Sequence, residues 1–356
     1  MAYSGTVGTT VISVQNLIDD SARACGKLAE ELTDEQVISS KRQLFYLLSS
    51  LINKGIQYWA INTKVIGLNV DQYTYDLPLG AVDALNVLYR TMNRPTPNGL
   101  GGYFASSGFV ANAFDNNTYT ICQQTAPNGN IGINYGDDNY IYAGSIGILP
   151  GVSGQFHILL ETSFDGITWT TLYDCGVETW VDDQWLWYNI DPGATTQFYR
   201  MRETGGNTLA VREFYVGNNS REIQMSRLNR DDYSNLPNKN FTANQPYQFY
   251  FERTIPLPKI VLWPTPNDPF IQMTVWYSRQ IMDVGDLNGQ LEIPQRWYLA
   301  ITNMLAHRMS LILPAVPLDR TVYLEKQASI TFEEVEQEER DKSPIYWAPN
   351  ISPYTK

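Results

Sequence analysis

Basic side chains are the scarcest feature of this 356-residue sequence, which has 25 Lys and Arg against 37 Asp and Glu and a formal net charge of −12. Lysine is absent from residues 65–238. Binding to nucleic acid phosphates needs clustered cations that displace counterions. The charge balance therefore argues against a protein that grips DNA or RNA, although DNA can slide past an acidic wall without specific binding.

Histidine and cysteine are also rare, with 2 His and 3 Cys. Cys25, Cys122 and Cys175 are far apart and odd in number, which describes neither a disulfide framework nor a CxxC metal site. We expect thiols in a reducing cytosol. His157 falls in a strand-like run and His307 in an apolar helix, so both suit structural roles better than catalytic ones.

The motifs of common enzyme classes are missing as well. There is no HExxH, Walker loop or GxSxG. Adjacent carboxylates could serve a glycosidase only if the fold held two of them about 5 to 9.5 Å apart, and solvated turns explain such pairs better. We therefore expect no enzyme, no catalytic residue and no cofactor. The pairs are Asp137-Asp138, Asp182-Asp183 and Asp231-Asp232.

Long hydrophobic runs are absent too. No window approaches the roughly 18 apolar residues of a membrane span, and the start lacks a basic region followed by an apolar core. We expect a protein that is made in the cytoplasm and does not enter a membrane.

Helical periodicity is present near both ends of the chain. Apolar residues recur at three- and four-residue spacing over residues 11–32, and Thr33 and Gln36 form a capping-box pattern that starts a second helix reaching about residue 62. We expect these two helices to pair antiparallel. Pro294 precedes a third apolar stripe that Pro314 ends, and a last helix is expected over residues 318–341.

Strand-like runs lie between these helices. They occupy residues 64–90, 247–251, 259–263 and 270–277. The 23 Tyr, 9 Trp and 13 Phe also favour strands.

The composition changes between residues 96 and 219. This stretch has 12 acidic side chains and 3 Arg, a net charge of −9, and residues 96–217 hold 17 of the 25 glycines. Strand-like runs at 156–162, 169–173, 185–190 and 198–202 alternate with turns. We predict an α+β chain in which residues 95–220 form an inserted antiparallel, jelly-roll-like β-sandwich. Residues 1–94 and 221–356 are expected to fold together as one helix-bundle-plus-small-β-sheet domain.

Short motifs in the outer segments carry a family resemblance. Met225-Ser226-Arg227-Leu228 and Asp232-Tyr233 precede Gln245-Pro246-Tyr247, and the strands at 260–266 and 274–277 end in Pro-Thr-Pro and in tyrosine. This order resembles the head-to-tail adaptor (tail tubular) proteins of podoviruses over roughly residues 1–94 and 221–356. The resemblance implies a virion protein at the head-tail junction. It would form a dodecameric ring between the portal protein and the tail nozzle protein, through which DNA passes.

The end of the chain is the expected contact with the portal or a neighbouring subunit. An extended tail buries little surface within its own protomer, and its apolar residues suit anchoring to a partner. A frayed terminus is the alternative. The candidate anchors are Ile345, Tyr346, Trp347, Ile351 and Tyr354.

The insert carries a second resemblance, in the stretches 111–116, 161–169 and 197–202. They are similar to the "AFDG", "S.DG..W" and "ARYVRI" stretches of discoidin-like, galactose-binding-like sandwiches. Asn116 replaces the usual glycine or acid, and Gln197 and Phe198 replace Ala-Arg. Such modules often tie their loops with a calcium ion, here near Asp115 and Asn117, for which an Asx-rich turn is the alternative.

Sugar recognition needs exposed aromatic faces beside fixed polar groups. The main prediction is a structural virion protein whose insert docks tail fibres, other virion proteins or a glycan. The alternatives are a carbohydrate-binding receptor-recognition protein and a glycan-degrading enzyme. Trp185 and Trp187 share one strand face and suit a core. The docking candidates on predicted loops are Tyr135, Tyr140, Trp180, Asp182 and Asp183, with Asp137 and Asp138 nearby.

Overall fold

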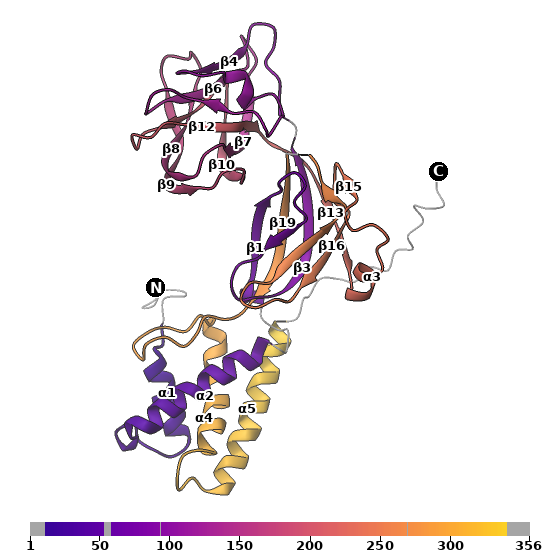
Figure 1. Cartoon of the computed structure of the whole chain (residues 1–356). Helices are drawn as coiled ribbons and strands as arrows, with labels where there is room; N and C mark the ends of the chain where they lie inside the picture. Colours follow the sequence, from indigo (N-terminus) through magenta and orange to yellow (C-terminus); the bar gives the residue numbers. More distant parts are fainter. Residues whose placement is uncertain (1–10, 53–57, 93, 269, 340–356) are drawn as a thin grey trace. The chain divides into compact units, whose positions relative to one another are not determined.

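The computed structural model describes residues 11–52, 58–92, 94–268 and 270–339 (Figure 1). It divides the chain into two compact units. The helical unit comprises Met1–Ile61 and Ser278–Lys356, and the β unit comprises Asn62–Tyr277.

Four helices pack around one core in the helical unit: α1 (Val14–Ala24), α2 (Asp34–Ile52), α4 (Tyr298–Ser310) and α5 (Leu318–Glu338), with short 3-10 turns at Ala29–Glu31, Tyr58–Ala60 and Gln295–Trp297. Helix α4 contacts each of the other three, and the core includes the fully buried Leu17, Leu44 and Leu305. None of the helices in the described ranges combines the length and hydropathy needed to cross a bilayer.

The start of α2 follows the predicted capping box. The Thr33 N–H donates to Gln36 Oε1 (3.0 Å), and the Gln36 N–H donates to Thr33 Oγ1 (3.4 Å). Helix α1 is shorter than predicted, because Gly26 takes a φ of +85° just beyond its end. This left-handed conformation ends a helix and leads the chain away.

Two four-stranded sheets form the scaffold of the β unit. Their strand orders are β1-β19-β3-β13 and β14-β16-β17-β2, and their shared core includes Leu68, Phe249 and Met273. The strands are β1 (Ile61–Gly67), β2 (Thr74–Asp76), β3 (Ala81–Met92), β13 (Asn219–Gln224), β14 (Ser226–Leu228), β16 (Gln248–Glu252), β17 (Lys259–Trp263) and β19 (Ile271–Arg279), with α3 (Arg230–Ser234) and the small pair β15 (Thr242–Ala243) and β18 (Thr265–Pro266) beside them.

The segment between β3 and β13 forms the predicted antiparallel β-sandwich. Its sheets have the orders β10-β7-β12-β5 and β4-β6-β11-β8-β9, and Ile133, Tyr199 and Phe214 lie in the core between them. The elements are β4 (Gly102–Ala105), a 3-10 turn (Val110–Ala113), β5 (Cys122–Gln123), β6 (Asn130–Asn134), β7 (Ile141–Pro150), β8 (Gly154–Ser163), β9 (Thr170–Trp180), β10 (Leu186–Thr196), β11 (Phe198–Glu203) and β12 (Ala210–Gly217).

The single domain predicted for residues 1–94 and 221–356 is not what the structure shows. The helices cover one another's apolar stripes, and the scaffold sheets cover one another's apolar faces, so each set has its own core. A further cluster that includes Trp185, Tyr215 and Phe270 joins sandwich and scaffold sheets within the β unit. The division therefore separates helices from strands, and the sandwich lies in the same unit as the scaffold sheets.

Candidate functional site

Two loops at one end of the sandwich expose large apolar side chains. Tyr140 ends the loop between β6 and β7, while Phe164 and Ile167 lie in the loop between β8 and β9. The exposed fractions are 50%, 66% and 84%. The rings of Tyr140 and Phe164 have centroids 6.2 Å apart, so the two loops meet. We call these three residues the aromatic platform.

The β8–β9 loop is fixed by its own aspartate. Asp165 Oδ1 accepts the N–H groups of Ile167 (2.8 Å) and Thr168 (2.7 Å). These bonds to the charged form lower the pKa of the exposed Asp165 carboxyl to about 2. Gly166 follows with a φ of +70°. The Asp-Gly turn of the "S.DG..W" stretch thus orients Phe164 and Ile167.

The β6–β7 loop is held in a comparable way. Gly136 has a φ of +99°, and the Asn139 side chain donates to the Tyr135 carbonyl (3.0 Å). Gln197 Nε2 donates to Asn134 Oδ1 (3.0 Å) and to Asp137 Oδ1 (3.4 Å). Gln197 is a departure from the family stretch, and its side chain here fastens a loop of the platform.

A Trp-Arg stack continues from the platform loop onto the outer face of the five-stranded sheet. The Arg200 Cζ atom lies 3.9 Å from the Trp169 ring centroid, and the Trp169 indole donates to the Gly166 carbonyl (3.2 Å). Arg200 also binds Glu161 (2.6 Å). Burial opposes ionisation of Glu161, but hydrogen bonds from Arg202 and Arg200 keep its pKa below the usual value. The half-buried Trp169 is thereby fixed at the end of the β8–β9 loop.

Two of the predicted docking residues are in the core instead. Tyr135 and Trp180 are both 0% exposed. The Tyr135 hydroxyl donates to the Val216 carbonyl (3.0 Å), and Trp180 stacks on Phe156 with centroids 4.4 Å apart. Trp180 is the last residue of β9 rather than a loop residue. Neither ring offers a face to a ligand, and the prediction for these two residues is wrong.

The other predicted residues are exposed but do not form one site. Asp137 and Asp138 lie in the platform loop with Tyr140. Asp182 and Asp183 instead lie in the loop that joins β9 to β10, where they line a different hollow. Phe164 and Ile167 were not predicted, although the "S.DG..W" stretch contains both of them. Ile345, Tyr346, Trp347, Ile351 and Tyr354 lie outside the described residues.

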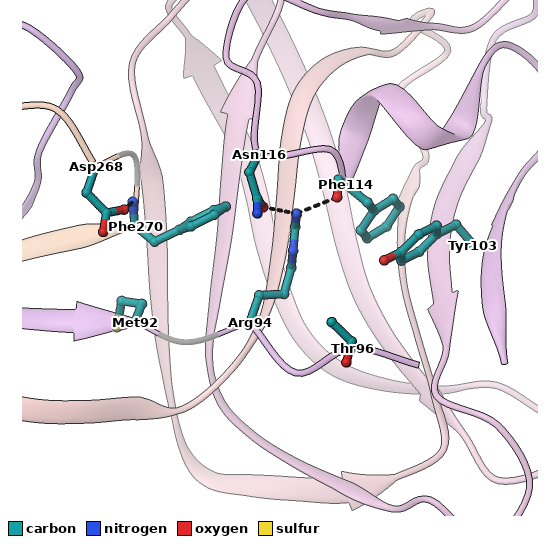
Figure 2. A pocket seen from close by; sticks show the side chains of 8 residues that line it. All are labelled: Met92, Arg94, Thr96, Tyr103, Phe114, Asn116, Asp268 and Phe270. Carbon is teal, nitrogen blue, oxygen red and sulfur yellow. Dashed lines mark hydrogen bonds between the residues drawn. The ribbon is translucent and has the colours of Figure 1, made fainter. Parts of the chain in front are cut away.

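A pocket of about 450 Å³ lies where β3 leads into the sandwich (Figure 2). Arg94 points between the rings of Phe114 and Phe270, at 5.5 and 5.0 Å from their centroids. Its guanidinium donates to the Phe114 carbonyl, to Asn116 Oδ1 and to Glu213 Oε2. The lining residues are Met92, Arg94, Thr96, Tyr103, Phe114, Asn116, Asp268 and Phe270.

These bonds bear on the calcium site considered for this turn. Asp115 Oδ1 accepts the Asn117 N–H (2.9 Å), and Asp115 Oδ2 accepts the Thr120 hydroxyl (2.8 Å), which is the Asx-type alternative. The neighbouring oxygen atoms already surround the Arg94 guanidinium. A resident calcium ion would have to displace that cation, so the residues present do not fit one. Within the described ranges, no three His, Cys, Asp or Glu side chains are grouped to hold a metal.

No protein-family model matches this chain, and no curated protein matches it. Among solved structures, it is similar to the Clostridium perfringens protein CpGH89CBM32-5 in complex with GalNAc-beta-1,3-galactose, with 15% identity, a TM-score of 0.30, and coverage of 34% of this chain and 98% of that one. It is also similar to the family 32 CBM of C. perfringens NanJ in complex with galactose, with 16% identity, a TM-score of 0.28, and coverage of 36% of this chain and 98% of that one. A third similar structure is a chitosan-binding module of a Paenibacillus sp. IK-5 chitosanase/glucanase, with 20% identity, a TM-score of 0.28, and coverage of 36% of this chain and 99% of that one.

Proposed function

We propose that the β-sandwich binds a neutral glycan through the aromatic platform. The main evidence is the pair of exposed rings of Tyr140 and Phe164, whose centroids lie 6.2 Å apart on two loops that are fixed by hydrogen bonds. Sugar rings expose C–H faces that pack on aromatic faces. Because the loops are already fixed, binding does not have to order them, and less conformational entropy is lost.

The polar groups beside the platform define the class of sugar. The exposed carboxylates of Asp137 and Asp138 accept hydrogen bonds from sugar hydroxyls and repel carboxylated or sulfated sugars. Arg200, the cation of the Trp-Arg stack, is already bonded to Glu161. A neutral hexose or N-acetylhexosamine fits these groups better than an acidic sugar.

The test is a glycan array probed with the full chain, followed by calorimetry with each neutral glycan that binds. The double variant Tyr140→Ala/Phe164→Ala should lose affinity at least about tenfold. Tyr119→Ala is the matched control, because Tyr119 is 79% exposed and outside the platform. Equal losses in both variants, or no neutral glycan bound, would overturn the proposal. Turnover of the bound glycan would instead support the glycan-degrading alternative.

We propose assembly with other protein subunits as a second function, because the helical unit exposes large apolar side chains. Helix α5 exposes Leu318 (77%), Val322 (56%) and Tyr323 (59%), and α2 exposes Ile38 (59%) and Tyr46 (48%). Large apolar side chains gathered on helix surfaces are typical of protein interfaces. They suit a protein interface. In the adaptor hypothesis, the helical unit would use this interface to form a ring with portal and nozzle proteins, and the sandwich would contact a glycan or tail fibres.

Native mass spectrometry of the full chain, alone and with a portal protein, tests the assembly hypothesis. A closed ring that stacks on the portal is expected, and Val322→Glu/Tyr323→Glu should reduce it to monomers. A wild-type protein that stays monomeric at high concentration and ignores the portal would leave the glycan-binding function standing alone.

A further inference from the structure

A groove distinct from the aromatic platform runs along the β unit between the β1–β2 segment and the start of β10. It consists of two hollows of about 510 and about 450 Å³ that share Asn69, Gln72 and Gln184 in their walls. Ligand-binding pockets commonly have volumes of about 300 to 1,000 Å³, so each hollow is large enough for a sugar unit. We call it the tryptophan groove, lined by Asn69, Gln72, Asp183, Gln184, Trp185 and Trp187.

The aromatic part of the groove is the half-buried Trp187 indole, which stacks on the Trp185 indole; Trp185 is 9% exposed and belongs to the core cluster with Tyr215 and Phe270. The rings of Trp185 and Trp187 have centroids 4.8 Å apart and planes inclined by 21°. They come close to the scaffold only because residue 67 is glycine, since a Cβ there would lie 2.5 Å from Trp187 Nε1 and 2.7 Å from the Trp185 Cβ atom. The groove thus combines an aromatic wall from the sandwich with a polar wall from the scaffold.

Trp187 and Asn69 line the groove, and each has one buried polar atom, the donor Nε1 of Trp187 and the acceptor Oδ1 of Asn69. Among the residues that the structure describes, neither atom has a hydrogen-bond partner. Buried polar groups are almost always paired in folded proteins, and an unpaired one costs free energy. A sugar hydroxyl can accept from an indole N–H and donate to an amide oxygen.

The charged side chains give the groove a net negative character, because its lining includes Asp71, Asp76 and Asp183 against Lys64. Asp182 beside them is bonded to Arg212 at 3.0 Å. Carboxylates disfavour phosphates and acidic sugars. The Gln72 amide is already bonded to Asn69 and to the Thr74 carbonyl, whereas the exposed Gln184 amide suits hydroxyl groups. This chemistry matches an uncharged polyhydroxylated chain.

We infer that the tryptophan groove is a second saccharide-binding site, which takes a neutral oligosaccharide long enough to occupy both hollows. The inference rests on the proposed function for its ligand class alone, because the groove shares no residue with the aromatic platform. The main evidence is the stacked Trp pair together with Trp187 Nε1 and Asn69 Oδ1, the two buried polar atoms without a hydrogen-bond partner among the described residues.

The probe is a series of neutral oligosaccharides of one to six units, titrated into the full chain while tryptophan fluorescence and calorimetric heat are recorded. Trp187→Phe keeps an aromatic ring but removes the N–H, and Gln184→Ala removes an exposed amide from both hollows. Each should weaken binding of the longer oligosaccharides at least about tenfold. Trp276→Phe changes an indole that is 46% exposed and lies outside both the groove and the platform, so it is the matched tryptophan control and should leave their groove binding unchanged.

The outcomes separate this inference from the proposed function. Loss of long-oligosaccharide binding in the groove variants, with or without an effect of Tyr140→Ala/Phe164→Ala, supports the groove. Loss only in the platform variant would overturn the groove and leave the platform. Equal affinity of long oligosaccharides for wild type, Trp187→Phe and Gln184→Ala would also overturn it.

Discussion

Arg94 and Glu213 form a buried ion pair, with 2.8 Å between Nη1 and Oε2 and side-chain exposures of 8% and 0%. Arg94 follows β3, and Glu213 belongs to the last strand of the sandwich, so the pair ties the entry of the sandwich to its exit. Within the described part of the chain, the second carboxylate oxygen of Glu213 has no hydrogen-bond partner. Three predictions about stability concern this pair and the neighbouring core.

Replacing Arg94 with Met should destabilise the β unit strongly. At pH 8 the variant leaves the buried Glu213 either charged without its cation or forced to bind a proton, and breaking such a buried pair costs about 3 to 5 kcal/mol. Arg90→Met is the control, because its partner Glu222 is 46% exposed and such pairs contribute about 0 to 1 kcal/mol. Urea unfolding followed by circular dichroism measures both. Equal losses of unfolding free energy would contradict the prediction.

The same pair makes stability depend on pH. Burial raises the pKa of Glu213 to about 7 in the folded chain, from 4.5 as its usual value, even with Arg94 beside it. The folded state therefore holds this proton more tightly than the unfolded state does. The stabilisation that comes from protonated Glu213 is fully present below about pH 4.5 and is lost as the pH rises through 7. The melting temperature should fall between pH 5 and pH 8, and Glu213→Gln should flatten that fall; an unchanged slope would contradict this.

Trp180→Ala should act on folding and not on ligand recognition. Removing a fully buried indole from the sandwich core costs about 3 to 5 kcal/mol. Tyr119→Ala, at 79% exposed, should stay within about 0.5 kcal/mol of wild type. Thermal denaturation of both variants decides the matter. A stable Trp180→Ala protein that has lost glycan binding would show that the buried position is misassigned.

Asp165→Ala should loosen the β8–β9 loop without unfolding the sandwich. The variant removes the acceptor for the Ile167 and Thr168 N–H groups. Amide hydrogen exchange at these residues should speed up, and glycan affinity should fall several-fold. Asp165→Asn keeps an acceptor oxygen and should behave more like wild type. Unchanged exchange in Asp165→Ala would rule out this role.

Gly67→Ala should disturb the tryptophan groove. The added Cβ would meet Trp187 Nε1 at 2.5 Å, so the indole has to move. A shift in tryptophan emission and weaker oligosaccharide binding are expected. Gly99→Ala, where no atom lies within 4 Å of the new Cβ, is the control. Identical emission spectra for the two variants would contradict the close contact.

Local patterns in the sequence predicted the elements well. The Thr33 and Gln36 pairing needs only neighbours along the chain, and the sandwich follows from regular strand and turn spacing. The contacts between distant segments were harder to predict. Trp185 and Trp187 were expected in a core, but their contact with Gly67 depends on how the sandwich meets the scaffold sheets, and no periodicity encodes that.

The errors at the candidate site have the same origin. Whether an aromatic residue near a strand end points inward depends on strand register, and a shift of one residue reverses it. Trp180 and Tyr135 were placed on loops and are buried, whereas Tyr140 is exposed. The prediction of one domain shared by helices and strands was wrong for a similar reason. An amphipathic pattern shows that one face of an element is covered, but it does not show which other element covers it.

Strands β3 and β13 are antiparallel neighbours, paired from Met92 with Asn219 to Leu88 with Gln224. The whole sandwich is therefore, in topological terms, one very long hairpin loop. A short turn in its place would leave the scaffold sheet continuous, and a different module could be spliced in at the same junction. The inserted module can thus differ without a change in the strand order of the scaffold sheet.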